Sequence, residues 1–539
     1  MISATSSRIL RDRPLPRIAV WGVLALVALG MAWLFAEPLA TYRLHSDDFE
    51  YLSASRTFDR AVSNLFRAHN THIVPAWRLL TYAVMQTAGR LANLQPVLAC
   101  VSFAALVLAG LALYRFVARE LGHAWLGVLA FILLGTTSLL KSSATWYSSG
   151  QTLWAALGIL LMLLCLQSWR THQKWPWLVA ASLCAWAAGA FWTIGHAAGP
   201  TGAVYLWNDG RRNARIAAVI PLLATGVSIA LALVLGGRYI DAKISFHGRT
   251  QSQAINALAG TTHTLQAIPE NLVGENLGLE FETTELQGAL LTSALIAAWL
   301  CTWRVAKPGP LEWTGGCLLS SAYLVEWSFR GYLPFSSLRG IVPWYDTIPH
   351  IGLVLILCGT LARVLRIARK DQPSPYVAAL TKHQTAALLL AQLLLIGVHA
   401  PRVEQLYIND VPAMSEAESA TFLTHDLQRT RAQLLAKEYA RLQRIDLAKL
   451  DQATQIGRRL GIGRDQIAHV FGRVDILELP KVYDAIGLLD LPASGKPIDP
   501  TILRNALARS LTPSPAPTIP AAFLKSSPSN PESAQHPAN

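Results

Sequence analysis

Long apolar runs almost free of charge are the feature that most limits what this chain can fold into. They extend over roughly 17 to 22 residues, the length that a helix needs to cross about 30 Å of hydrocarbon. Hydrophobic residues make up 52% of the 539-residue chain and charged residues only 15%, which is too apolar for a soluble protein of this size. The sequence therefore predicts an all-α polytopic membrane protein.

Reading the runs along the chain gives about eleven transmembrane helices. The first run lacks a clean cleavage pattern and is predicted to stay as a span. The eleven predicted spans are residues 18–36, 95–118, 124–140, 152–169, 177–192, 196–207, 216–237, 286–303, 314–329, 347–365 and 385–399.

The distribution of Lys and Arg predicts the orientation, because these residues stay on the cytoplasmic side of a membrane. With the N-terminus inside, the cytoplasmic segments are rich in Lys and Arg, whereas the outer loops hold both signs in balance. This asymmetry accounts for the net charge of +13 and argues against nucleic-acid binding. We expect a multi-pass protein of the bacterial inner membrane, with its C-terminus extracytoplasmic.

The predicted domains follow from these spans. A cytoplasmic N-terminus (1–17) precedes a transmembrane domain (18–400) with two long outer loops, at 37–94 and 238–285. Residues 73–91 of the first loop have the mixed apolar and basic pattern of an amphipathic interfacial helix. Residues 401–511 predict a small extracytoplasmic helical domain, and the Pro/Ser/Ala-rich residues 512–539 predict a disordered tail. The six cysteines lie in apolar runs and indicate neither disulfides nor a metal site.

The most informative segment lies directly after the first span. It carries three carboxylates, Asp47, Asp48 and Glu50, close to the membrane interface. Mutual repulsion and low polarity there should raise the pKa of at least one, which suits a general base acting on a hydroxyl near neutral pH. The alternative is a solvated loop that happens to be acidic.

Cationic and imidazole side chains follow in the same loop, among them His69 and His72. Beside carboxylates they could hold a phosphate leaving group, or they could bind a metal ion together with Asp47 or Asp48. Other polar candidates on the outer side are Lys141, which either contacts a lipid phosphate or snorkels to the interface, and Glu326 with its nearby partner Arg330.

These motifs resemble the GT-C superfamily of integral-membrane glycosyltransferases, particularly the protein O-mannosyltransferase and aminoarabinose-to-lipid A transferase branch. Asp47-Asp48 with Tyr51 looks like the acidic pair that the family carries after its first span, and Pro75 with Trp77 looks like its later Pro-aromatic motif. The resemblance implies a GT-C-like helical bundle. It also implies that Asp47 is the catalytic base, although Asp48 replaces the commoner Glu and leaves the choice between the two open.

The same resemblance implies a reaction in which a sugar is transferred, with inversion, from a polyprenyl-phosphate donor to the hydroxyl of an extracytoplasmic glycan, lipid or protein. Arg339 is similar in placement to an arginine that relatives keep before a late span, and would hold phosphate. The predicted substrate- or phosphate-binding set also contains His69, His72, Lys141, Arg330 and Glu50, of which Glu50 would orient the base. No cofactor is required by this reading, and a divalent metal is the alternative. The rival functions are a transporter or flippase of lipid-linked glycans, which would carry broken helices or ionisable residues at mid-membrane, and a membrane scaffold.

Overall fold

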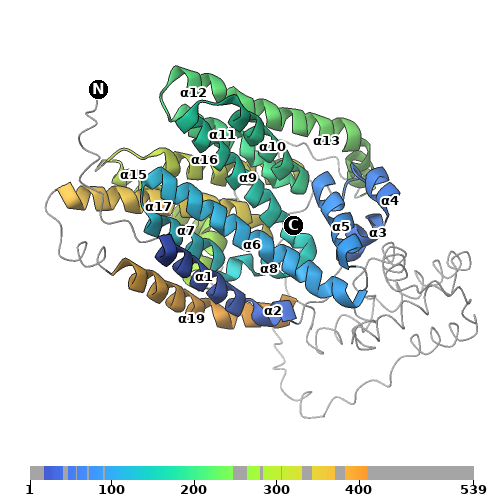
Figure 1. Cartoon of the computed structure of the whole chain (residues 1–539), viewed down its shortest axis with the longest axis horizontal. Coiled ribbons are helices and arrows are strands. Elements are labelled where there is room, and N and C mark those ends of the chain that lie inside the picture. Colours follow the sequence, from blue (N-terminus) through green and yellow to red (C-terminus); the bar gives the residue numbers. More distant parts are fainter. Residues whose placement is uncertain are drawn as a thin grey trace, which may run out of the picture. The chain divides into compact units, whose positions relative to one another are not determined.

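A computed structural model describes the helical part of the chain: residues 17–40, 47–55, 57–69, 72–88, 91–246, 264–279, 283–304, 306–330, 343–370 and 383–410. Apart from one isolated β-bridge, the regular elements in these ranges are helices, with η marking 3₁₀ or π turns. In chain order (Figure 1) they are α1 Arg17–Leu34, α2 Ala36–Ala40, α3 Asp47–Ala54, α4 Phe58–Ser63, α5 Pro75–Ala88, α6 Leu91–Leu121, α7 Ala124–Gly135, η2 Ser138–Leu140, α8 Lys141–Thr145, α9 Tyr147–His172, α10 Trp175–Phe191, η3 Thr193–Ala197, α11 Ala198–Trp207, α12 Arg212–Ala217, α13 Val219–Phe246, η4 Ile268–Glu275, α15 Glu285–Thr302, α16 Pro310–Arg330, η6 Pro343–Asp346, α17 Thr347–Lys370 and α19 Gln384–Asp410.

Five helical stretches are long and apolar enough to cross a membrane, and a bent pair, α7 with η2–α8, makes up to six. Three shorter apolar helices lie at Ile18–Leu34, Trp175–Phe191 and Leu286–Thr302. By length and composition the chain is thus a multi-pass membrane protein. Each of the eleven predicted spans falls on a helix, while the number that cross the bilayer stays a prediction. The five long stretches are Val97–Leu121, Tyr147–His172, Arg212–Gly236, Thr347–Leu365 and Gln384–Val403.

The core of the described bundle lies around α9, which packs against α6 on one side and α10 on the other (Figure 1). Within its apolar window, 78% of the residues are buried inside the protein, against 22% for the stretch Arg212–Gly236. That stretch instead exposes large apolar side chains such as Leu223 and Val234. Apolar side chains on the outside of a membrane helix are suited to contact with lipid.

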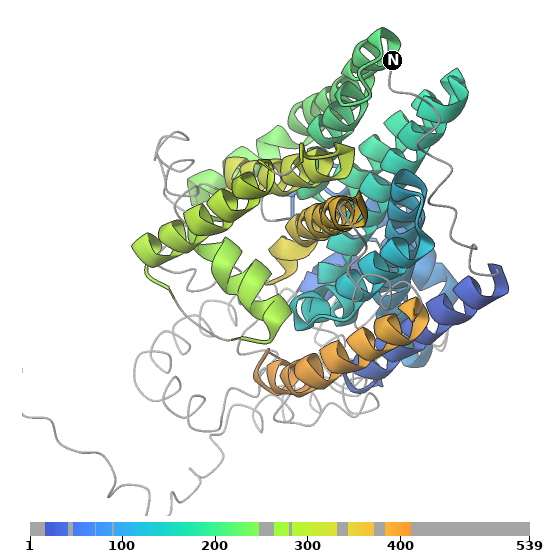
Figure 2. The same cartoon turned by 90° about the vertical axis from the view of Figure 1, so that its left-hand side faces the viewer.

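The first and last described helices, α1 and α19, lie side by side (Figures 1 and 2). Gln392 of α19 is buried and donates a hydrogen bond of 2.8 Å from Nε2 to the backbone carbonyl of Val27. A buried amide in an apolar helix pair needs such a partner. The two ends of the predicted transmembrane domain are therefore joined directly.

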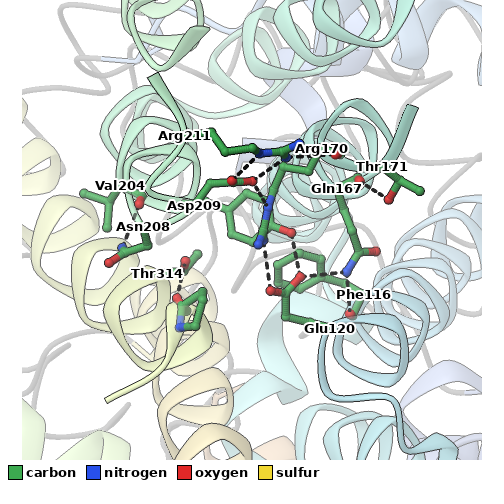
Figure 3. Close-up of polar contacts among 12 residues, drawn as sticks. Phe116, Glu120, Gln167, Arg170, Thr171, Val204, Asn208, Asp209, Arg211 and Thr314 are labelled. Carbon is green, nitrogen blue, oxygen red and sulfur yellow. Dashed lines mark hydrogen bonds and ion pairs between the residues drawn. The ribbon is translucent and has the colours of Figure 1, made fainter. Parts of the chain in front are cut away.

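A polar cluster joins α6, α9 and α11 at the ends predicted to be cytoplasmic (Figure 3). Glu120 accepts hydrogen bonds from Arg170 (2.9 Å) and from the Tyr205 hydroxyl (2.6 Å). Arg170 also donates to Asp209 at 2.7 Å, and Arg211 closes the cluster on the same carboxylate. Because each carboxylate faces an arginine, the cluster stabilises the helix ends without leaving a buried charge unpaired.

The predicted third span, 124–140, is not one straight helix. α7 ends at Gly135, and the chain turns by 58° into Ser138–Thr145. Thr137 caps the start of η2, because its hydroxyl accepts a hydrogen bond of 3.3 Å from the backbone amide of Leu139. Apolar runs report burial but not direction, so the bend was invisible in the sequence.

A helix, α5, lies within the predicted amphipathic segment 73–91 and buries Trp77, Arg78 and Thr81 on one face. Its place at the membrane interface stays a prediction. The predicted C-terminal domain (401–511) lies outside the described residues beyond Asp410, and so do the tail (512–539) and much of the second long loop.

Candidate functional site

Asp48 lies near the start of α3 and is fully buried. Its Oδ1 accepts a hydrogen bond of 2.9 Å from the backbone amide of Ser148 and a second, short one from the Ser148 hydroxyl. Ser148 is in the first turn of α9, where backbone amides are not used by the helix and are free to bind an anion. The helix start thus fixes the carboxylate that follows the first span.

Tyr51 lies one turn after Asp48 on α3 and faces the same helix start. Its hydroxyl donates to the Gln151 side-chain oxygen at 3.3 Å. The ring lies 4.7 Å from that of His69, and the guanidinium of the buried Arg78 lies 5.6 Å from its centre. A cation at this distance from an aromatic face is attracted to it. Tyr51 therefore lies between the start of α9 and His69.

The start of α9 is also held by α5. The rings of Trp77 and Tyr147 lie 4.5 Å apart, and the hydroxyls of Thr81 and Tyr147 are separated by 2.8 Å. Tyr147 directly precedes Ser148, so α5 supports the residue that binds Asp48. The predicted amphipathic segment of the first loop therefore packs against the start of α9.

His69 and His72, both buried, form the isolated β-bridge through two backbone hydrogen bonds of 2.8 Å. The Nδ1 of His72 lies 3.1 Å from the Thr193 hydroxyl, and its ring lies 3.9 Å from that of Trp192. Trp192 in turn lies 5.9 Å from Tyr345. His69 thus lies next to α3, and His72 lies next to the start of η3.

Lys141 is the first residue of α8 and only 3% exposed. A snorkelling lysine would reach the interface with its ammonium group, so this burial argues for a role inside the protein. Two residues on, Ser143 is hydrogen-bonded to Thr347 at 2.8 Å, and Thr152 of α9 donates to Ser143 at 3.1 Å. Hydroxyl groups therefore surround the segment between Lys141 and Ser148.

A second buried carboxylate, Asp346, was not predicted from the sequence. It accepts from the Tyr323 hydroxyl at 2.6 Å and from the Asn271 amide at 2.9 Å. The pKa of Asp346 is raised from its ordinary value to about 7, chiefly by burial. The hydrogen bonds from Tyr323 and Asn271 partly offset this rise, and the charge of Glu275 adds to it. An acid that titrates near neutral pH suits proton transfer. Asp346 stands alone in the sequence after Tyr345, so no motif marked it.

Four of the predicted site residues are described and buried: Asp48, His69, His72 and Lys141. Asp47 and Glu50 lie on α3 and Arg330 ends α16, but their side chains lie outside the described part; Arg339 lies outside it altogether. Sequence reasoning missed the partners, which come from distant segments: Ser148, Gln151, Trp192, Thr193, Asn271, Tyr323 and Asp346. Short polar residues inside apolar runs give no signal of their own.

The described residues contain no group of three or more His, Cys, Asp or Glu side chains arranged to hold a metal ion. Instead, His72 contacts a hydroxyl group of the protein, and Asp48 binds a backbone amide and a hydroxyl. The arrangement offers a fixed carboxylate, imidazoles and a buried ammonium, which are groups suited to orienting and stabilising an anionic ligand.

No protein-family model matches the chain, and no curated protein matches it. Among solved structures the chain is similar to the archaeal oligosaccharyltransferase AglB from Archaeoglobus fulgidus, solved in complex with an inhibitory peptide and a dolichol-phosphate. The identity is 15%, the match covers 72% of this chain and 56% of that one, and the TM-score is 0.40. The chain thus spans little more than half the length of that protein, and a likeness of this degree does not by itself place it in a family.

Proposed function

We propose that this chain is an inverting membrane glycosyltransferase of the GT-C type, which moves a sugar from a polyprenyl-phosphate donor to the hydroxyl of an extracytoplasmic glycan, lipid or protein. The observation that carries the proposal is the buried carboxylate of Asp48, which accepts hydrogen bonds from Ser148. Tyr51 of the same helix lies beside His69. A merely solvated acidic loop would leave its carboxylates in water. The proposed setting is the bacterial inner membrane, with the N-terminus cytoplasmic and the C-terminus outside.

The Oδ1 atom of Asp48 is already occupied by the amide and the hydroxyl of Ser148. We therefore assign Asp48 to anchoring α3 and Asp47 to taking the proton. In the reaction the acceptor oxygen bonds to the anomeric carbon, Asp47 takes the acceptor proton, and the bond from that carbon to the lipid phosphate breaks. Lys141, His69, His72 and Arg339 are assigned to the charge that develops on the departing phosphate. The proposal requires no metal, and a divalent metal on the phosphate is its alternative.

The test is transfer of label from a panel of radiolabelled polyprenyl-phosphate sugars into membrane acceptors, at equal folded yield. Asp47→Asn is expected to lose at least about a hundredfold in rate, the scale of a general base. Asp48→Asn is expected to lose less, because its amide oxygen still accepts from Ser148. The exposed Asp59 of the same loop supplies the control, Asp59→Asn. Unchanged transfer in both site variants would exclude this site as the source of the base.

One observation favours the rival, a transporter or flippase of lipid-linked glycans. The bent pair α7 and η2–α8 is a broken helix within an apolar segment, and broken helices mark the binding sites of many transporters. If wild type transfers no sugar from any donor but moves lipid-linked glycan across reconstituted vesicles, the transporter takes the place of the enzyme.

A further inference from the structure

The bend after α7 leaves two backbone groups without their helical partners. In a continuous helix the carbonyl of Leu133 would accept from residue 137, and the amide of Ser138 would donate to Leu134. The 58° turn removes both bonds. Backbone groups that lose their partners away from water must find others within the protein.

His350 of α17 satisfies the first group. Its Nε2 lies 3.0 Å from the Leu133 carbonyl oxygen. Because a carbonyl only accepts, Nε2 must carry the proton, so Nδ1 of the neutral ring is the acceptor. That atom lies 3.1 Å from the side-chain amide of Asn276, just after η4.

His399 of α19 satisfies the second group, because its Nδ1 accepts from the Ser138 amide at 3.3 Å. The Ser138 hydroxyl donates to the Glu275 carboxylate at 2.8 Å, and Arg402 donates to the same carboxylate at 3.2 Å. Both histidines are buried. Two different helices thus supply one imidazole each, one to either side of the bend.

The bend determines the direction of α8, which starts at Lys141 and leads into Tyr147 and Ser148, the start of α9. We propose that His350 and His399 are positioning residues: they hold the broken helix so that α8 leads into Ser148 at the place where Ser148 binds the Asp48 carboxylate. This inference rests on the proposed function for the meaning of that site. The bend itself is independent of the reaction.

The two rings use different nitrogens, which gives a crossed set of variants. Asparagine places an acceptor near the Nδ1 position, and glutamine places a donor near the Nε2 position. His399→Asn and His350→Gln should therefore retain the contact, whereas His399→Gln and His350→Asn should lose it. We expect kcat for sugar transfer to fall at least about tenfold in the second pair, as misplacement of catalytic groups does, and to stay within about threefold of wild type in the first pair.

A second readout needs no reaction. Ser143 is fully buried on α8, and Ser143→Cys in a chain whose six native cysteines are replaced reports opening of the bend by its rate of maleimide labelling. Labelling should be slow in the parent, in His399→Asn and in His350→Gln, and at least about tenfold faster in His399→Gln and His350→Asn because the segment opens locally.

The two readouts separate the inference from the proposed function. The crossed labelling pattern in a chain that transfers no sugar would support the positioning role and overturn the transferase. The positioning role would be overturned if all four histidine variants had the labelling rate and the kcat of wild type. It would also be overturned if all four showed the same increase in labelling rate and the same loss of kcat. Either result leaves the proposed function standing if the wild type transfers sugar.

Discussion

At the scale of single residues, two fully buried carboxylates behave differently from the surface acids of the chain. Asp48 and Asp346 each accept two described hydrogen bonds. Those of Asp48 come from the start of a helix, whereas those of Asp346 come from Tyr323 and Asn271. Burial favours the neutral form of a carboxyl group and hydrogen-bond donors favour the charged form, so the balance at each site determines its charge.

Asp346→Asn is expected to flatten the pH dependence of stability. Burial raises the pKa of Asp346 from its ordinary 3.8 to about 7, so the folded chain binds this proton more tightly than the unfolded chain does. The contribution of Asp346 to stability is therefore greatest below pH 3.8 and is lost as the pH rises through about 7, a change on the order of 4 kcal/mol.

Thermal unfolding of the solubilised protein between about pH 4 and pH 8 checks this expectation. The unfolding midpoint of wild type should fall with rising pH more steeply than that of Asp346→Asn. Asp59→Asn, at an exposed position, should keep the wild-type slope. Equal slopes in wild type and Asp346→Asn would contradict the assignment.

Ser148→Ala is expected to destabilise the site. It removes the hydroxyl bond to Asp48 but keeps the amide bond, and losing a hydrogen bond to a buried charge costs about 1.5–3 kcal/mol. Ser148→Thr restores the hydroxyl and should recover most of the loss. Ser182→Ala, which removes a half-buried hydroxyl bonded only to its own helix at Leu178, serves as the matched control in the same unfolding measurement.

At the scale of elements, polar side chains join the ends of neighbouring helices. Arg363 of α17 donates to the backbone carbonyls of Thr302, which ends α15, and of Ala306 in the segment that follows, at 2.8 Å each. The same guanidinium pairs with Glu312 of α16 at 2.5 Å. One side chain therefore ties together three helices, and both members of the ion pair are buried.

Arg363→Met is expected to lower stability by about 3–5 kcal/mol, because it leaves the buried Glu312 charge without its partner. The double variant Arg363→Met/Glu312→Met should recover part of this loss, since no buried charge is left over. The effect is measured by chemical or thermal unfolding of four proteins: wild type, Arg363→Met, Glu312→Met and the double variant. Arg304→Gln, at an exposed position, controls for simple loss of positive charge, and a single variant as stable as wild type would show that the pair is dispensable.

At the scale of the whole transmembrane part, the candidate site and the largest described ion-pair cluster lie at opposite predicted sides of the membrane. The candidate site is built from residues of the predicted outer loops and the adjoining helix ends. The cluster of Glu120, Arg170, Asp209 and Arg211 lies at helix ends predicted to be cytoplasmic (Figure 3). This separation is what alternating spans require.

A labelling experiment tests the orientation. Asp59→Cys in the first loop and Lys174→Cys between α9 and α10, both at exposed positions, are made in a chain without the native cysteines. We expect an impermeant maleimide to label Asp59→Cys in intact cells and Lys174→Cys only after the membrane is opened. Labelling of both positions in intact cells would show that the predicted spans between them are miscounted.

The sequence by itself determined the helical, membrane-spanning class, because helix length and apolarity are local properties that the bilayer reads directly. It also pointed to Asp48, His69, His72 and Lys141, since charged and imidazole groups stand out beside apolar runs. Only the tertiary structure decided which groups meet them. Ser148 pairs with Asp48 across 100 residues, and Asn271 and Tyr323 reach Asp346 from separate helices. The bend at Gly135 and the two histidines that hold it were decided there too, because a hydrogen bond depends on distance in space and not on spacing along the chain.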